Sequence, residues 1–288
     1  MVSVPGMSSA TAPESLQEIT LSSDPGDLAR TARRDICDGL MMWELWARLG
    51  WSETKRRYRR TLLGPFWVSA SLALFATVLA FVWASLWKQG VREYLPFLLS
   101  GLLPWTMIAG SIGESCYAFF NGEALIKSRQ FAYTTLINVV LARNVIVFLH
   151  NLIAYFAIAL AIGAGINAWT LLLLPGLLLV TANLAWICLL ITILCLRYRD
   201  FQQMVTSLIQ IAMFVTPVFW SPAQLKGDLA WIVDWNLLYH LIYVIRAPLL
   251  GQAPEALSYL VCTASALLGR FAAVWLYSRK RHRIAYWF

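Results

Sequence analysis

The sequence predicts an all-α integral membrane protein with six transmembrane helices. Hydrophobic residues make up 59% of the 288-residue chain and charged residues only 13%, and the mean hydropathy is +0.63. Ordinary soluble domains carry about a quarter charged residues, which they need to cover their surface. A chain with so few polar residues cannot cover a water-exposed surface, so we expect most of it to face lipid.

Six apolar runs account for the predicted spans. Because the hydrocarbon core of a bilayer is about 30 Å thick, a helix that crosses it needs about 20 mainly apolar residues. The runs identified on this basis are 62–87, 94–120, 136–162, 169–196, 204–219 and 256–277.

Lys and Arg residues are concentrated on one side of these spans. Eighteen of the 23 precede the first span or fall in the loops and the tail on the same side, whereas four fall on the opposite side. Positive charge stays on the cytoplasmic side during membrane insertion. We therefore expect both termini to be cytoplasmic. This placement explains the net charge of +8 without a nucleic acid partner.

Two regions precede the six-span domain. Residues 1–35 are rich in Ser, Pro and Ala and are expected to form a mobile cytoplasmic tail. Residues 36–60 combine Leu and Trp with charge at helical spacing, which is typical of an amphipathic helix in the membrane interface. A soluble helix packed on a partner is the alternative. This region ends in a basic collar, Lys55, Arg56, Arg57, Arg59 and Arg60.

The six-span domain, residues 61–288, contains one unusual external segment. Residues 220–254 are too apolar for a solvated loop and too interrupted by polar residues for a span. We expect short helices that dip into the outer leaflet, with their ends covered by protein or reaching water. The last residues, 279–288, are expected to form a basic cytoplasmic tail.

Sequence motifs of common enzymes are absent. The chain has no GxxxxGK[ST] phosphate loop, no HExxH motif and no GxSxG motif. Its three histidines and five cysteines are dispersed, so neither a metal site nor a disulfide framework is expected. Catalysis by this chain alone is therefore not predicted.

Polar residues within spans are costly in lipid and mark either cavities or helix contacts. Glu114 in the second run is open to both interpretations, a position on a transport path or a pairing with another helix. Arg270 in the sixth run lies near the cytoplasmic end, and we expect its side chain to extend to that surface.

Aromatic residues make up 14% of the chain, and many lie near span ends, as in a membrane interface belt. Others lie within spans, where a flat apolar ring offers a surface along which sugar rings can slide. Packing explains most of them. The candidates for lining a path are Phe75, Trp83, Glu114, Tyr117 and Tyr155.

Five motifs in order resemble one transporter family. They are "ELWARLGWSETKRRYRRTLLGPFW", "LLSGLLPWTMIAGSIGES", "FFNGEALIKSRQFAYTTL", "RYRDFQQMVTSLIQIAMFVTPVFWSP" and "WNLLYHLIYVIRAPLLGQ". The chain resembles, over residues 40–280, the type 2 permeases of ABC transporters, in particular those that export O-antigen, capsular polysaccharide or teichoic acid. Two departures are the missing proline in "SRQFAY" and Trp235-Asn236-Leu237 in place of Asn-Pro.

The resemblance implies an assembly in the bacterial inner membrane. Two copies of this chain would bind two ATP-binding subunits, which would hold ATP and Mg, and move a polyprenyl-pyrophosphate-linked polysaccharide to the periplasm. This chain would hold no cofactor. Its partners would be a second copy, the ATP-binding subunits, the lipid-linked glycan and membrane lipids.

The resemblance also implies roles for particular residues. The cytoplasmic segment 121–133 would couple to the ATP-binding subunits, with Asn121, Glu123, Lys127 and Arg129 as the residues involved. Arg199 and Asp200 in the "RYRD" turn are a second possible contact, or else simple topology signals.

Two further roles are hypotheses built on this assembly. The basic collar would attract the pyrophosphate, in addition to binding lipid headgroups. The external segment would act as an outer gate through Asp234, Asn236, His240 and Arg246.

Two alternatives remain at this point. The same fold could export another lipid or a drug. A membrane transferase acting on a polyprenyl lipid would need loop carboxylates or a metal site, and the short loops between the spans offer neither.

Overall fold

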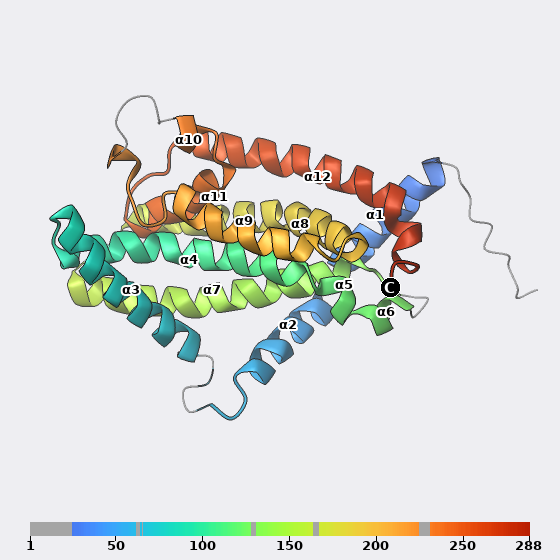
Figure 1. Cartoon of the computed structure of the whole chain (residues 1–288), viewed down its shortest axis with the longest axis horizontal. Coiled ribbons are helices and arrows are strands. Elements are labelled where there is room, and N and C mark those ends of the chain that lie inside the picture. Colours follow the sequence, from blue (N-terminus) through green and yellow to red (C-terminus); the bar gives the residue numbers. More distant parts are fainter. Residues whose placement is uncertain (1–24, 62–63, 65, 128–130, 164–166, 225–230) are drawn as a thin grey trace, which may run out of the picture.

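A computed structural model describes residues 25–61, 64, 66–127, 131–163, 167–224 and 231–288, and within these ranges the regular elements are all helices. Long helices run side by side along the molecule (Figure 1). Five stretches are long and apolar enough to cross a membrane: α3 (Phe66–Trp87), α4 (Val91–Ser115), α7 (Thr134–Ile162), Ala168–Arg197, which comprises η1 (Ala168–Leu172) and α8 (Leu173–Arg197), and α12 (Ala256–Ile284). The all-α membrane class is confirmed.

The fifth predicted span is shorter than expected. It corresponds to α9 (Phe201–Val215), whose 15 residues rise roughly 22 Å, less than the bilayer core of about 30 Å. The chain leaves helical geometry at Thr216, and the following residues to Phe219 are buried without being helical. By length alone, the described residues therefore contain five spans rather than six.

The N-terminal region differs from the predicted tail and single interfacial helix. Two helices are present, α1 (Pro25–Met41) and α2 (Trp43–Arg57), separated by a break at Met42. Residues 1–24 lie outside the described ranges. Residues 25–35 belong to α1, and both Ala32 and Asp35 are buried, so the boundary predicted at residue 35 is wrong.

Asp35 explains why α1 is held to the bundle. Its carboxylate accepts hydrogen bonds from the backbone N–H groups of Tyr133 and Thr134, both at 3.2 Å, from the Tyr277 hydroxyl at 2.7 Å and from the Arg281 guanidinium at 2.8 Å. A buried carboxylate is stable only when it is paired and hydrogen-bonded in this way. These contacts join α1 to the start of α7 and to α12. They also explain why α12 stays helical for two turns beyond its predicted end.

The central helix is α4, which is largely buried and contacts α3, α7, α8, α9 and α11 (Leu237–Leu249). α3 packs on α4 and α7, and Ala76, Ala80 and Ala84 on its inner face are all fully buried. Residues four apart share one helix face, and small residues there allow close approach in a membrane. The opposite face of α3, which includes Phe75 and Phe81, is exposed.

The two ends of the bundle differ in character. One end carries α1, two short helices α5 (Ala118–Asn121) and α6 (Glu123–Lys127), and the C-terminus (Figure 1). Because α1 and the last turns of α6, α8 and α12 carry Lys and Arg residues there, we call it the basic end. The opposite end carries η2 (Pro222–Gln224), α10 (Trp231–Asp234) and α11.

Helix α11 is inserted among α4, α8 and α12 and is buried along most of its length. At its closest approach to α8, a Cβ atom on Gly176 would lie only 2.6 Å from the Val244 carbonyl oxygen, so only glycine fits there. The external segment therefore contains a core element of the bundle, not a surface loop.

Ala80→Leu tests the packing of α3 on the bundle. The larger side chain has no space at this fully buried position, and overpacking of this kind typically costs about 1–3 kcal/mol. We expect a matching loss in the free energy of unfolding, measured by denaturant titration in detergent micelles. Val78→Leu, on the exposed face of the same helix, should change stability little. Equal effects of the two substitutions would contradict the assigned packing face.

Candidate functional site

The basic collar is located at the end of α2, which packs against α7. Glu44 in the first turn of α2 and Lys55, Arg56 and Arg57 in its last turn complement the helix dipole. Beyond the helix, the chain turns through Arg60, whose φ of 70° is unusual for a residue other than glycine.

A cluster of charged side chains fixes this helix to the bundle. The Glu114 carboxylate on α4 accepts hydrogen bonds from Arg57 on α2 at 2.9 Å and from Arg143 on α7 at 2.6 Å. Asn144 donates to the same carboxylate at 2.7 Å, and Arg143 also pairs with Glu53 on α2. Three helices are thus joined through one carboxylate. Of the two interpretations of Glu114, a position on a transport path or a pairing with another helix, the structure shows the pairing.

This cluster divides the collar into two parts. Burial lowers the pKa of the Arg57 guanidinium, but the hydrogen bond and charge of Glu114 act in the opposite direction and the pKa is raised. Arg57 is therefore a fixed cation of the helix contact. Arg57 is itself 52% exposed, so what separates it from the exposed side chains of Lys55, Arg56, Arg59 and Arg60 is its pairing with Glu114.

The five candidates for path lining are not brought together. Phe75 lies on the exposed face of α3, and Tyr117 is exposed at the basic end. Trp83 stacks against Phe219 with ring centroids 6.2 Å apart. Tyr155 is buried, and its hydroxyl donates to the Leu249 carbonyl oxygen at 2.6 Å, so it packs within the bundle.

Most of the coupling candidates are located at the basic end. Asn121 ends α5, and Glu123 and Lys127 on α6 form an ion pair one turn apart. Arg199 and Asp200 are exposed in the turn between α8 and α9. Arg129 lies outside the described residues.

The last two residues of the chain lie against both of these regions. The Phe288 ring packs edge-on against Phe120 and lies 5.8 Å from the Lys127 ammonium group. The Trp287 ring lies 5.5 Å from the Arg197 guanidinium. Sequence reasoning missed both residues, although two adjacent aromatics after a basic helix end are a detectable signal.

The external segment is held by a buried arginine. Arg246 on α11 is 4% exposed and donates to the carbonyl oxygens of Pro217 at 2.6 Å and Val218 at 2.8 Å. Its guanidinium also lies over the Phe97 ring, 4.4 Å from the centroid. On the facing helix α4, Gly101 leaves the space that the guanidinium occupies.

The other outer-segment candidates fix the position of α11. Asn236 caps the helix, because its side-chain oxygen accepts from the backbone N–H groups of Leu238 and Tyr239. The His240 ring is buried and contacts the Ser258 hydroxyl at 3.0 Å and the Asp234 carbonyl oxygen at 2.9 Å. The Asp234 side chain is exposed and contributes through its backbone.

Comparison with known proteins assigns this arrangement to a family. The family described as "ABC-2 type transporter" matches residues 44–250, from the start of α2 to the end of α11. The chain belongs to the ABC-2 type transporter family. It is therefore a multi-pass membrane subunit of a transporter.

Similar proteins of this family are O-antigen export system permease proteins RfbA. One from Klebsiella pneumoniae is 25% identical over 194 residues, 66% of this chain and 74% of the relative. One from Myxococcus xanthus is 26% identical over 182 residues, 62% of this chain and 68% of the relative. A second protein from Klebsiella pneumoniae is 25% identical over 198 residues.

Three charged residues of this ABC-2 subunit join helices but are not predicted as site residues from the sequence. Asp35 falls in the predicted tail, and neither Arg143 nor Glu53 is among the predicted site residues. Arg143 sits about two and a half turns into α7, where an arginine needs a carboxylate partner. Since Glu114 is a carboxylate within another span, this requirement could have predicted it as the partner of Arg143. Among the residues that the structure describes, no cluster of His, Cys, Asp and Glu suited to a metal ion is present.

Glu114→Gln tests the charge cluster. The substitution leaves Arg57 and Arg143 without their shared carboxylate in a partly buried site, which should cost about 1–3 kcal/mol. Unfolding in detergent by denaturant titration measures the change. Glu123→Gln removes the exposed pair with Lys127 and should cost no more than about 1 kcal/mol. The interpretation fails if Glu123→Gln destabilises the chain as much as Glu114→Gln.

Gly101→Ala tests the Arg246 contact. The added methyl group would collide with the guanidinium and lie 2.9 Å from the Val218 carbonyl oxygen, so Arg246 has to shift. We expect a loss of about 1–3 kcal/mol in the free energy of unfolding. Gly113→Ala on the same helix has no atom within 4 Å of the new carbon and should be neutral or stabilising by about 1 kcal/mol. A neutral Gly101→Ala would show that the guanidinium is not confined there.

Proposed function

We propose that this chain is the permease subunit of an ATP-driven exporter that moves a polyprenyl-pyrophosphate-linked polysaccharide from the cytoplasm to the periplasm. The observation that carries the proposal is the similarity to three O-antigen export permeases within a family match that covers residues 44–250. Since the sequence contains no phosphate loop, the energy of ATP would reach it through separate ATP-binding subunits.

In this proposal, two copies of the chain and two ATP-binding subunits form the exporter in the bacterial inner membrane. The basic end faces the cytoplasm, as the distribution of Lys and Arg favours. The sixth span consists of α9 together with Thr216–Phe219, which continue toward the opposite end. An even number of spans then leaves both termini in the cytoplasm.

The exposed part of the collar is the proposed capture site for the pyrophosphate. Lys55, Arg56, Arg59 and Arg60 are exposed beside the first span, and the charge cluster around Glu114 holds their helix in place. Each Lys or Arg near an anionic surface contributes about 1 kcal/mol of attraction. A pyrophosphate diester on a lipid carrier offers such charge at headgroup depth.

The two ends of the bundle take different roles in this proposal. α5 and α6 form the contact with the ATP-binding subunit, together with the turn at Arg199 and Asp200. At the other end, α11 and its Arg246 contact close the periplasmic side. The exposed apolar face of α3, which includes Phe75, would line the passage between two copies.

Reconstitution tests the proposed function. The chain would be co-purified with its ATP-binding partner chain and placed in proteoliposomes. Lipid-linked O-antigen-type glycan should stimulate ATP hydrolysis and become accessible on the opposite face of the vesicle. If the complex forms but a short-chain phospholipid or a drug stimulates hydrolysis and the glycan does not, the cargo assignment is wrong.

The double substitution Arg56→Gln and Arg59→Gln tests the collar in the same vesicles. Loss of two cations should raise the glycan concentration needed for half-maximal stimulation by about tenfold or more, with basal hydrolysis unchanged. Arg57 is left intact because its loss would disturb the Glu114 cluster. Arg48→Gln, also exposed on α2 but outside the collar, is the matched control. An unchanged glycan requirement in the double variant would remove the collar from substrate capture.

A further inference from the structure

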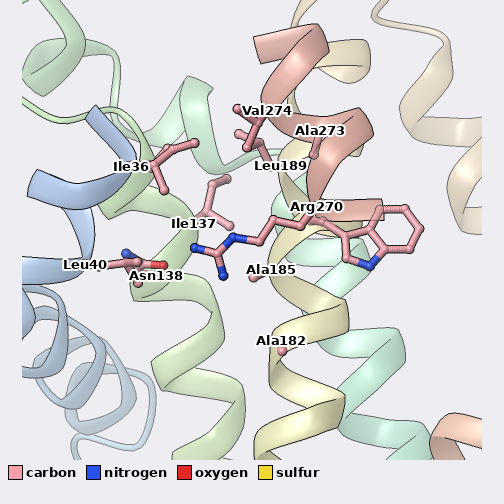
Figure 2. Close-up of a pocket in the computed structure, with 12 residues that line it drawn as sticks. Ile36, Leu40, Ile137, Asn138, Ala182, Ala185, Leu189, Arg270, Ala273 and Val274 are labelled. Carbon is pink, nitrogen blue, oxygen red and sulfur yellow. The ribbon is translucent and has the colours of Figure 1, made fainter. Parts of the chain in front are cut away.

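A small pocket lies between α1, α7, α8 and α12, away from the collar and from the outer segment. Its volume is about 80 Å³, between two and three times the share of roughly 30 Å³ that a water molecule takes in the liquid. Figure 2 shows Ile36 and Leu40 of α1 on one side, Ala182 and Ala185 of α8 below, and α12 on the other side.

Arg270 reaches into this pocket from α12. Its side chain extends sideways across the pocket toward Asn138 of α7, with the guanidinium between Ile137 and Ala185 (Figure 2). It does not run along α12 toward the basic end, as the sequence analysis expected. Among the described residues, none forms a hydrogen bond or ion pair with it. The Arg270 side chain is exposed on the surface of the chain, and an arginine within a spanning helix is costly unless an anion or an acceptor satisfies it.

The pocket has no acidic group to serve that need. Its described lining is apolar except for Thr134, Asn138 and Arg270, and contains no carboxylate. The Thr134 hydroxyl donates to Asp35, and the Asn138 amide donates to the Gly39 carbonyl oxygen at 2.9 Å. The Asn138 side-chain oxygen lies on the side of the guanidinium (Figure 2), but it forms no hydrogen bond with it, and Arg270 is the positive group of the pocket.

One wall of the pocket is flat and apolar. The Trp186 ring of α8 packs directly on Gly269 of α12, where any Cβ atom would collide with the indole. Trp186, Leu189 and Val274 line the pocket beside Arg270. Such a wall suits a hydrocarbon chain rather than a hydrated ion.

A second cation on α1 is in helical register with two residues that line the pocket. Arg33 is three residues before Ile36 and seven before Leu40, so all three share one face of α1. Arg33 is exposed. The carboxylate of Asp35 belongs to the helix contact with α7 and α12, on another face of α1.

We propose that this pocket binds the phosphate of an anionic membrane phospholipid, with Arg270 as its ligand and an acyl chain against the Trp186 wall. The guanidinium donates in pairs to phosphate oxygens, which is the geometry that arginine favours. Burial of the chain supplies the apolar contribution that a free phosphate ion lacks. The pocket lies beside α1 and the first turns of α7. This lipid site is independent of the polysaccharide cargo.

Retention of lipid through purification tests the site on the full-length chain. The protein is purified in detergent after exposure to phosphatidylglycerol or phosphatidylcholine, and bound lipid is counted by native mass spectrometry. Wild-type protein should retain phosphatidylglycerol, and Arg270→Gln should reduce the retained amount about tenfold, as expected for the loss of one charged hydrogen-bonding group. Ala185→Leu, which fills the pocket without a change of charge, should reduce it as well.

Controls separate this site from general charge and from free phosphate. Arg279→Gln removes an arginine of the same helix whose guanidinium stacks on Trp275 outside the pocket, and should retain phosphatidylglycerol like the wild type. Excess inorganic phosphate should not displace the lipid. The proposal is overturned if Arg270→Gln retains as much lipid as Arg279→Gln, or if Ala185→Leu retains as much as the wild type. Complete displacement by inorganic phosphate would overturn the lipid assignment.

Discussion

A polar group inside a lipid-facing bundle cannot be hydrogen-bonded by water, so it must find its partner within the protein. Three charged side chains show how this requirement determines the fold. Asp35 ties α1 to α7 and α12, Glu114 ties α4 to α2 and α7, and Arg246 ties α11 to the chain after α9. Between these points, small residues such as Ala80 let the helices approach closely.

Long apolar runs could be predicted from sequence because composition and length decide whether a helix spans a bilayer. Five runs each correspond to one long helical stretch, although α12 extends seven residues beyond its run and α4 ends five residues before the end of its run. The fifth predicted span does not, because Pro217 follows Thr216 and the helix ends before it reaches full length. The sequence shows that residues 220–254 are apolar, but it does not show that the reason is the burial of a helix in the bundle. Helix α11 is buried against three other helices, and burial by distant segments leaves no signal in local sequence.

The site residues likewise divide into those that local sequence predicts and those that depend on distant parts of the chain. The basic collar is recognisable as a run of five cations, yet only the folded chain separates Arg57 from its neighbours, because its partner Glu114 is 57 positions away. Asn236 was chosen as a gate residue and caps α11 instead through a local contact. Asp35 was placed in a tail because its donors come from residues 133, 134, 277 and 281, which no local pattern connects.

The Arg246 contact limits how the far end of the bundle can move. A displacement of α11 relative to the Pro217–Val218 carbonyls has to break two charge-assisted hydrogen bonds and expose a guanidinium to hydrocarbon. Motions that keep the contact intact carry α11 and the end of α9 as one rigid piece. The end of the bundle that carries α11 therefore does not fluctuate rapidly as a surface loop does. Its rearrangement is an activated event, with a rate that rises steeply with temperature.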